Sequence, residues 1–411
     1  MIVVREIQQK YRIKGFYKEK QFKETPIGKI PNEWEVATLE EVAEIVGGFT
    51  FPLELQGKKV GKYPFIKVGD MNKSYKYIAN AENYIDEKDL QKLHVNVFPK
   101  GTIIFPKIGM AIRLNKFRIL ACDALFDNNI AGIIPKNVDG EYLYYYFMGR
   151  VNLISLAGTT TVPSITKSRL EKLSIPLPSL EEQWGIAEVL SSVDNAIEAV
   201  DRLIEKLERV KQGLMQKTLT KGIGHKEFQE TEIGKIPKEW QIVKLETLFI
   251  LKNGERPEVI REDGEVPIYG AGFIQGYTDR FMINKEDVII IARVGKGSAG
   301  KVYIASGKMW ISDNAIYAVP RVSDVYPMYY YYYLQYLHLD RIAVRGAAGG
   351  YSLLTQSSLS NLYVPLPSYE EQKQIASTLK SIDDWIEVEK KRKEKLERLK
   401  RGLMDLLLTG R

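Results

Sequence analysis

One segment of this chain has the spacing of a nucleotide-binding loop, namely Gly295-Lys-Gly-Ser-Ala-Gly-Lys301. Such a loop surrounds phosphates with its backbone N–H groups, and a serine or threonine directly after the lysine binds Mg²⁺. Here Val302 stands in that place. The continuation is typical of a β-strand, whereas the phosphate site needs the N-terminus of a helix. A basic hairpin is therefore the better interpretation of this segment.

The residue types that other catalytic or metal sites need are scarce. Cys122 is the only cysteine, and His94, His225 and His338 lie far apart in the sequence, which leaves little material for a zinc site. The chain has no Asn-Pro-Pro-aromatic methyltransferase motif and no Gly-x-Ser-x-Gly nucleophile motif. We expect no catalytic residue and no metal ligand in this chain.

Composition suggests the compartment and the kind of partner. A single cysteine excludes an intramolecular disulfide and fits a reducing cytoplasm. No apolar stretch approaches the roughly 20 residues of a membrane-spanning helix, so we expect no membrane partner. The formal net charge is +7, with an isoelectric point near 9.0. This excess favours nucleic acid or another polyanion as partner.

Basic side chains at the ends of apolar runs and beside small hydroxyl residues could hold phosphates and pair with base edges of DNA. An ordinary helix-capping role is the alternative for those in the loops. The predicted DNA contacts are Lys73, Lys76, Lys107, Arg113, Lys116, Lys167 and Arg169 in the first half, and Arg293, Lys296, Lys301, Arg341, Arg345 and Tyr351 in the second.

The elements that must position these residues are repeated. Lys20 to Trp34 returns as Lys226 to Trp240, 206 residues later, and Ile175 to Thr220 returns as Val364 to Thr409, 189 residues later. Because the two offsets differ, the segments between the repeats differ in length, and their sequences differ far more. Repeated segments that match, separated by segments that differ, predict two variable modules on one symmetric scaffold.

The modules nevertheless share a skeleton. Lys107-Ile-Gly109 corresponds to Arg293-Val-Gly295, and Asp127-Asn-Asn129 corresponds to Ser312-Asp-Asn314. Each module then has a tyrosine-rich run and a loop of small and hydroxyl residues. The tyrosines could stack on bases, but packing in a helical core is the favoured interpretation.

The second repeat predicts two long helices with a heptad seam. The seams most simply bury each other as an antiparallel pair, although packing on their own modules or self-association is an alternative. Lys211 interrupts the first seam, and Glu389 and Lys393 interrupt the second. The apolar members of the first seam are Ile186, Leu190, Val193, Ile197, Val200, Ile204, Leu207 and Leu214, and those of the second seam are Ile375, Leu379, Ile382, Ile386, Leu396, Leu403 and Leu407.

The ends of the chain complement each other. The chain stops at Arg411, where the first copy would continue through Lys221 to Gln229, and the stretch before Thr25 supplies that continuation. We therefore expect neighbouring termini and a pseudo-twofold ring. Ser179 and Ser368 stand where they can cap the first turn of each long helix.

In this cyclic order the motifs resemble those of specificity subunits of type I restriction–modification systems. The resemblance covers nearly the whole chain and rests on IGKIP followed by tryptophan twice, on GTTTVPSIT, on IPLPSLEEQ and VPLPSYEEQ, and on the long helices with LER and GLM. It implies two target-recognition domains, each reading one half of a split asymmetric site in double-stranded DNA. It also implies helices that set the spacing and dock two methyltransferase subunits.

The same resemblance assigns the chemistry to other chains. In that family the methyltransferase binds S-adenosylmethionine and methylates adenine, while restriction subunits act as the motor, hydrolyse ATP and cut. We therefore expect no cofactor in this chain, with S-adenosylmethionine, ATP and magnesium in partner subunits. One alternative is a basic coiled-coil scaffold that binds proteins and touches DNA only incidentally. Another is a nuclease or methyltransferase with unrecognised motifs.

The predicted fold class is α+β, with two globular β-rich target-recognition domains joined by two long antiparallel coiled-coil helices in a pseudo-twofold cyclic arrangement. The predicted domains are an N-terminal extension that completes the cyclic repeat (1–24), target-recognition domain 1 (25–179), a central spacer helix (180–222), target-recognition domain 2 (223–368) and a C-terminal spacer helix (369–411).

Overall fold

The computed structural model describes residues 21–158, 162–295, 297–345 and 352–411. The chain divides into two compact units. Unit 1 comprises Met1–Asp201 and Lys391–Arg411, and unit 2 comprises Arg202–Lys390. Because the two boundaries lie 189 residues apart, which is the offset of the repeated helices, the units divide both helices at the same repeat position.

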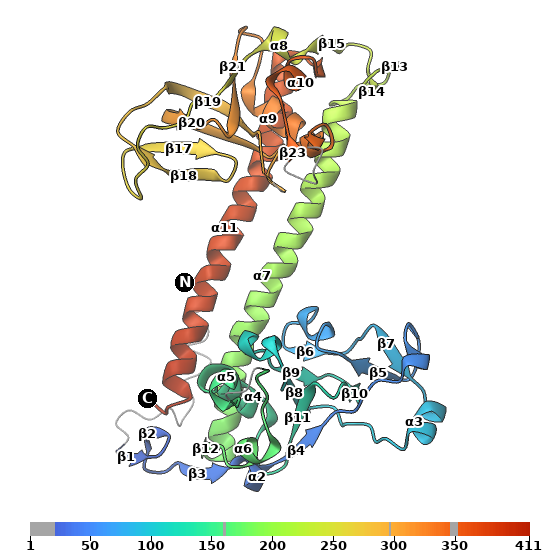
Figure 1. Cartoon of the computed structure of the whole chain (residues 1–411), viewed down its shortest axis with the longest axis vertical. Coiled ribbons are helices and arrows are strands. Elements are labelled where there is room, and N and C mark those ends of the chain that lie inside the picture. The colour runs from blue at the N-terminus through green and yellow to red at the C-terminus, as the bar shows by residue number, and fades with distance from the viewer. Residues whose placement is uncertain (1–20, 159–161, 296, 346–351) are drawn as a thin grey trace. The chain divides into compact units, whose positions relative to one another are not determined.

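Two long helices contain the second repeat. α7 spans Leu180–Lys221 and α11 spans Tyr369–Leu407 (Figure 1). Both have the expected serine cap, because Ser179 Oγ and Ser368 Oγ each accept a hydrogen bond from the backbone N–H three residues on, at 3.3 Å. These caps satisfy helix N–H groups that have no partner within the helix.

An ion pair of the same kind joins the two helices in each unit. In unit 1, Lys400 of α11 donates to Asp194 of α7 at 2.6 Å. In unit 2, Lys211 of α7 donates to Asp383 of α11, also at 2.6 Å. Lysine and aspartate are each related by the offset of 189 residues, so the sequence repeat is also a structural repeat. Lys211, which interrupts the apolar seam, is thus an interhelical ion-pair partner.

The helices run antiparallel, as expected. In unit 1 a second ion pair joins Asp201 to Lys393 at 2.7 Å. Asp201 lies seven residues after Asp194 in α7, whereas Lys393 lies seven residues before Lys400 in α11. Lys393, one of the two polar interruptions of the second seam, therefore pairs across the helices.

The burial of the seam drifts along its length. An α-helix rotates by about 20° per heptad relative to a strict seven-residue repeat, so the buried position moves on after several heptads. Of the seam residues, Leu214, Ile382, Leu396 and Leu403 are only half-buried. The neighbouring positions Met215, Leu219, Met404 and Leu408 are buried instead. Buried seam residues are Ile186, Leu190, Val193, Ile197, Val200, Ile204, Leu207, Ile375, Leu379, Ile386 and Leu407.

Unit 1 is built around a five-stranded sheet in the order β4-β11-β8-β9-β6 and a three-stranded sheet in the order β10-β5-β7. β1 pairs with β2 in a hairpin, and β12 pairs with β3. The strands are β1 (Phe22–Thr25), β2 (Gly28–Pro31), β3 (Glu35–Thr38), β4 (Ala43–Gly47), β5 (Tyr63–Ile66), β6 (Tyr77–Ile78), β7 (Asn83–Ile85), β8 (Ile103–Pro106), β9 (Arg118–Leu120), β10 (Leu125–Phe126), β11 (Ile130–Pro135) and β12 (Ser174–Leu177).

The short helices of unit 1 pack around these sheets. They are α2 (Leu39–Val42), α3 (Glu87–Leu93), α4 (Gly140–Arg150), α5 (Leu153–Leu156) and α6 (Lys167–Glu171), with 3₁₀ turns η1 (Leu53–Leu55), η2 (Asp70–Asn72) and η3 (Met110–Leu114).

Unit 2 is built around a six-stranded sheet in the order β16-β21-β19-β20-β17-β18, and β15 pairs with β24. The strands are β13 (Phe228–Thr231), β14 (Gly234–Pro237), β15 (Gln241–Lys244), β16 (Phe249–Asn253), β17 (Val266–Gly270), β18 (Phe273–Thr278), β19 (Ile283–Ala292), β20 (Val302–Ile311), β21 (Ala315–Pro320), β22 (Val344–Arg345), β23 (Ser352–Leu353) and β24 (Tyr363–Leu366). The helices are α8 (Leu245–Leu248), α9 (Pro327–Tyr336) and α10 (Gln356–Ser360), with the 3₁₀ turn η4 (Leu339–Arg341).

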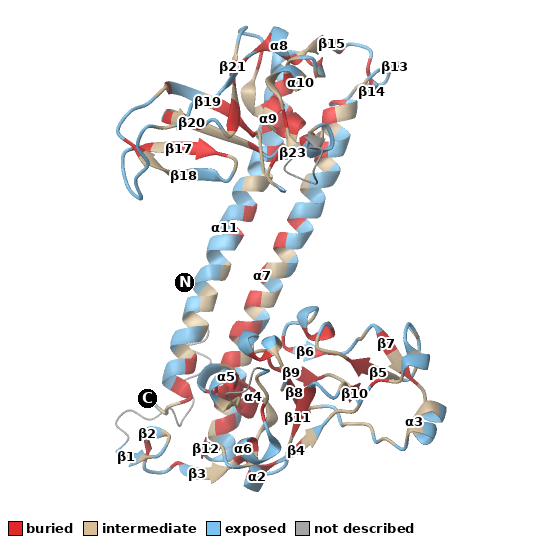
Figure 2. Ribbon diagram, in the orientation of Figure 1, coloured by how far each residue is buried: buried red, intermediate tan, exposed pale blue. Residues whose placement is uncertain are grey.

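The tyrosine-rich runs form core helices. In α4 and α9 most of the tyrosines are buried (Figure 2). Tyr142 donates its hydroxyl proton to the Pro176 carbonyl at 2.9 Å, and Tyr330 donates to the Pro365 carbonyl at 3.1 Å. Each tyrosine thus ties its helix to the strand that leads into a long helix. Core packing, and not base stacking, accounts for these runs.

The C-terminal end of α11 packs against the first tryptophan of unit 1. Gly410 lies so close that a Cβ would come within 2.3 Å of Pro31 and 3.0 Å of Trp34. Gly222, after α7, approaches Trp240 in the same way in unit 2. Residues 1–20, which would complete the ring, lie outside the described residues. No helix in the described part of the chain is long and apolar enough to cross a membrane.

Candidate nucleic-acid interface

One basic residue stands at the end of a buried strand in each unit. Lys107 follows β8, and Arg293 follows β19. The N–H of Lys107 donates to the Asn129 carbonyl at 2.9 Å, and the N–H of Arg293 donates to the Asn314 carbonyl at 2.9 Å. The carbonyls of both residues also accept a hydrogen bond from the hydroxyl-rich loop that follows, at 2.9 Å and 2.8 Å. The backbone frame around the two residues is therefore the same.

In each unit a glycine from a third segment of the chain packs against the turn beside this basic residue. Gly48 donates to the Ile130 carbonyl at 3.3 Å, and Gly254 donates to the Ala315 carbonyl at 2.9 Å. A Cβ on either glycine would lie 2.2 Å from a carbonyl oxygen of the neighbouring turn. Only glycine permits this approach. Neither glycine was singled out from the sequence, although each stands at the end of the segment that follows Trp34 or Trp240 in its module.

The turns beside these strand ends are held by their own side chains. In unit 1 Asp127 Oδ1 accepts the N–H of Asn129 at 2.8 Å. In unit 2 Ser312 Oγ takes the equivalent position and accepts the N–H of Asn314 at 3.3 Å. The predicted correspondence of these turns is therefore seen in three dimensions, with a carboxylate in one unit and a hydroxyl in the other.

Positive charge gathers around Lys107. A backbone bridge between Ile108 and Ser164 joins the strand end to the loop that precedes α6. On α6, Lys167 and Arg169 are exposed, and Arg169 Nη1 donates to the Leu156 carbonyl at 3.0 Å. Lys167 lies 3.8 Å from Glu171, a weak surface contact. Arg113 and Lys116 lie in and just after η3, which begins three residues beyond Lys107.

The described residues of the Gly295–Lys301 segment form a hairpin turn between β19 and β20, as predicted. The N–H of Lys301 donates to the Ser298 carbonyl at 3.0 Å, and the chain continues into a ten-residue strand. No helix N-terminus follows the described part of this loop, so it is not a nucleotide-binding loop. The side chain of Lys301 is exposed.

Arg293 lies beside this hairpin. Its Nη1 is 3.5 Å from the Asp313 carbonyl, and its Nε is a buried donor without a hydrogen-bond partner among the described residues. Arg341 is exposed in η4, which packs against Gly300. Lys296, Tyr351 and the side chain of Arg345 lie outside the described residues.

Comparison with known proteins explains this paired arrangement. The model of the type I restriction modification DNA specificity domain matches residues 31–209 and again residues 237–398. The chain belongs to this family. Each matched segment contains one of the basic strand ends, so this specificity subunit has two DNA specificity domains.

Full-length relatives agree with this assignment. The MjaX specificity subunit of Methanocaldococcus jannaschii is 33% identical over 96% of this chain and 97% of the relative. The MjaVIII specificity subunit of the same organism is 28% identical over 97% of both chains. The crystal structure of an S subunit from M. genitalium has the same fold, with a TM-score of 0.64 at 20% identity, covering 93% of this chain and 98% of that chain.

The position of Lys76 argues against a contact with DNA. Its side chain is buried, and its Nζ donates to Glu141 at 2.7 Å, to Ser191 at 2.8 Å and to Tyr145 at 3.0 Å. Burial lowers the pKa of Lys76, and the hydrogen bond to Glu141 opposes this shift. The amine is used inside unit 1, so the structure does not support the prediction for this residue.

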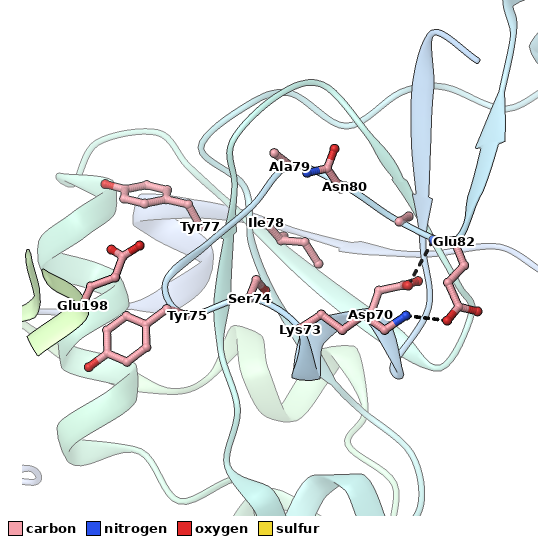
Figure 3. Close-up of a pocket in the computed structure, with 11 residues that line it drawn as sticks. Asp70, Lys73, Ser74, Tyr75, Tyr77, Ile78, Ala79, Asn80, Glu82 and Glu198 are labelled. Atoms are coloured by element: carbon pink, nitrogen blue, oxygen red, sulfur yellow. Dashed lines mark hydrogen bonds and ion pairs between the residues drawn. The ribbon is translucent and has the colours of Figure 1, made fainter. Parts of the chain in front are cut away.

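Lys73 has an acidic neighbourhood. Figure 3 shows its amine turned toward Glu82, in a pocket of about 380 Å³ that also contains Asp70 and Glu198. The ion pair to Glu82 is 2.5 Å long, and this hydrogen bond raises the pKa of Lys73. The charge of Lys73 is thus compensated before any phosphate approaches, unlike that of Arg113, for which no ionic partner is found among the described residues.

Proposed function

We propose that this specificity subunit reads a bipartite, asymmetric site in double-stranded DNA. Each unit contacts one half of the site through the loops around Lys107 or Arg293. The proposal is carried by one observation: the same backbone frame holds a basic side chain at a strand end in both units, while the residues around it differ. The same backbone arrangement with different surrounding side chains suits two domains that recognise two different half-sites.

The chemistry of these loops suits a major groove. Arginine and lysine pair with the acceptors of guanine there, and each base pair shows a distinct pattern of donors and acceptors. The exposed Lys167, Arg169, Lys301 and Arg341 suit phosphates, which fix orientation and make affinity dependent on salt.

The helix pair suits two further tasks, spacing the readers and docking two methyltransferase subunits. The same lysine–aspartate pair occurs in each unit, so two copies of one partner could meet equivalent surfaces. We place S-adenosylmethionine in those methyltransferase subunits, and ATP and magnesium in restriction subunits that act as the motor. The assembly would work in the cytoplasm, where the DNA is.

A module exchange tests independent reading. Residues 25–176 are replaced by those of a relative that recognises another site, and modified adenines are mapped by sequencing. We expect one half of the recognised sequence to change and the other half to stay. A change in both halves, or in neither, contradicts the proposal.

A paired deletion tests the spacing role. Residues 200–206 of α7 and 388–394 of α11 are removed together, which excises Asp201 and Lys393 but keeps the ion pairs of Lys211 and Lys400. Seven helical residues span about 10 Å. The tolerated spacer should shorten, by at most about three base pairs at roughly 3.4 Å each. An unchanged spacer preference would mean that the helices do not set the distance.

Point substitutions separate reading from incidental DNA contact. Lys107→Ala and Arg293→Ala should each lower the affinity of the methyltransferase complex by about 1–3 kcal/mol if the side chain reads a guanine. Each should relax preference only in its own half-site. Lys92→Ala, on the exposed face of α3, is the matched control. A coiled-coil scaffold that merely touches DNA would show no sequence preference at any salt concentration.

A further inference from the structure

Unit 1 has an apolar groove beside its candidate interface. The groove measures about 550 Å³, and Val68, Met71 and Pro106 are among its lining residues. Met110 and Leu114 of η3 also line it, and their exposed fractions are 64% and 58%. Pro106 directly precedes Lys107, so the groove adjoins the strand end that we place at the DNA.

The two exposed side chains are held on a rigid turn. Ile112, between them in η3, is fully buried in the core of unit 1, whereas Met110 and Leu114 belong to none of its hydrophobic clusters. Asn115 ends the turn at φ +46° and is fixed by hydrogen bonds to the backbone of Val151 and Leu153, at 3.0 Å and 2.9 Å. Core packing therefore does not explain the outward apolar pair, but it does orient that pair.

The rim of the groove is basic. Arg113 and Lys116 line it, and no acidic side chain is among its described lining residues. Lys116 donates to the neutral amide of Asn72, so its charge is not cancelled. An apolar groove between cations complements DNA, where phosphates flank the base edges. The apolar group that the major groove presents is the 5-methyl group of thymine.

The corresponding turn of unit 2 lacks this feature. After Arg293-Val-Gly295 the sequence runs Lys-Gly-Ser-Ala-Gly-Lys, with no large apolar side chain. A docking surface for two copies of one protein partner should be present in both units. A feature that occurs in only one unit suits a reader of one half-site.

We propose that Met110 and Leu114 form a thymine-reading surface in unit 1. They take up the 5-methyl group of a thymine in the half-site of that unit, while Arg113 and Lys116 bind the flanking phosphates. The inference rests on the proposed function, and it assigns to unit 1 a base preference that unit 2 reads by other means.

The test uses the full chain with its methyltransferase subunits and duplexes of the recognised sequence. Each thymine of the half-site read by unit 1 is replaced in turn by deoxyuridine, which lacks only the methyl group. At one position affinity should fall about fourfold, the effect of removing one buried methyl-sized group. Met110→Ala with Leu114→Ala should bind the thymine and deoxyuridine duplexes equally. Leu53→Ala, which removes an exposed leucine outside the groove, should keep the fourfold preference.

Other results would overturn the inference. It fails if the half-site contains no thymine, if deoxyuridine binds equally well, or if the double variant still prefers thymine. It also fails if the double variant loses its methyltransferase subunits instead of its base preference, because the groove would then bind protein. In all these cases sequence-specific binding persists. A complex without any sequence preference would instead contradict the proposed function itself.

Discussion

In unit 1 and unit 2 the variable module is attached to the helix pair in related but unequal ways. In unit 1 the Tyr145 hydroxyl donates to Asp194 at 2.7 Å, and in unit 2 the Tyr332 hydroxyl donates to Asp383 at 2.8 Å. Each aspartate also holds the lysine of the opposite helix. In each unit, a tyrosine of the variable module thus donates a hydrogen bond to the aspartate of the interhelical ion pair.

Unit 1 adds a partly buried cluster of hydrogen-bonded side chains from its variable module, which we call the clamp. Lys76 joins Glu141 of α4 to Ser191 of α7, and Tyr77 also bonds Glu141. Because α9 of unit 2 contains no carboxylate, it cannot build the same clamp. The variable modules therefore do more than read DNA, since one of them also supplies part of its own attachment.

The largest expected effect comes from removing the clamp. Lys76→Ala removes a buried lysine stem, which also donates to Ser191 and Tyr145, in addition to the cation of Glu141. Because lost packing and unpaired hydrogen-bond partners add to the lost ion pair, we expect unit 1 to be destabilised by about 3 kcal/mol. Hydrogen exchange of α4 amides should become roughly a hundredfold faster. Exchange of α9 amides in unit 2 should stay unchanged.

A double substitution controls for this result. Lys76→Met with Glu141→Leu replaces both charges by apolar groups, so neither partner of this ion pair is left as an unpaired charge. Protection of α4 should return close to that of the unaltered chain. If Lys76→Ala alone left α4 protected, the cluster would not attach the module to α7.

A smaller effect should separate the two repeated ion pairs. The side chain of Asp194 is 4% exposed, whereas that of Asp383 is 33% exposed. Lys400→Ala leaves Asp194 as a buried carboxylate without its cation, so we expect it to lower the stability of unit 1 by about 2 kcal/mol. In Lys211→Ala water can solvate Asp383, so we expect unit 2 to lose about 1 kcal/mol or less. Hydrogen exchange of α4 and α9 measures the two losses. Equal losses would show that the two ends of the helix pair are energetically alike.

The sequence predicts the scaffold well because its signals are local or repeated. The heptad seam, the serine caps and the correspondence of Lys107 with Arg293 follow from spacing along the chain and from comparison of the two copies. Lys76 was assigned to the wrong environment because charge alone does not reveal burial. Its partners Glu141 and Ser191 lie 65 and 115 residues away in the sequence. The apolar turn with Met110 was missed because exposure depends on which side of η3 meets the core.

The smallest expected effect is a response of unit 1 to acid. Burial raises the pKa of the Glu141 carboxyl, but hydrogen bonds from Lys76, Ser191 and Tyr77 outweigh burial and hold the pKa below its ordinary value of 4.5. The unfolded chain therefore takes up the proton first as the pH falls. The clamp contributes its full stability above about pH 4.5 and loses it as the pH falls through the folded pKa.

Hydrogen exchange of α4 in the unaltered chain and in Glu141→Gln, measured at the same pH values, isolates this term because the intrinsic exchange rates cancel. The ratio of the two rates should approach one as the clamp protonates, whereas the same ratio for α9 should not change with pH. A constant ratio for α4 would mean that the Glu141 carboxylate gains nothing from its partners. In that case the module of unit 1 would be held, like that of unit 2, by the tyrosine and the interhelical ion pair.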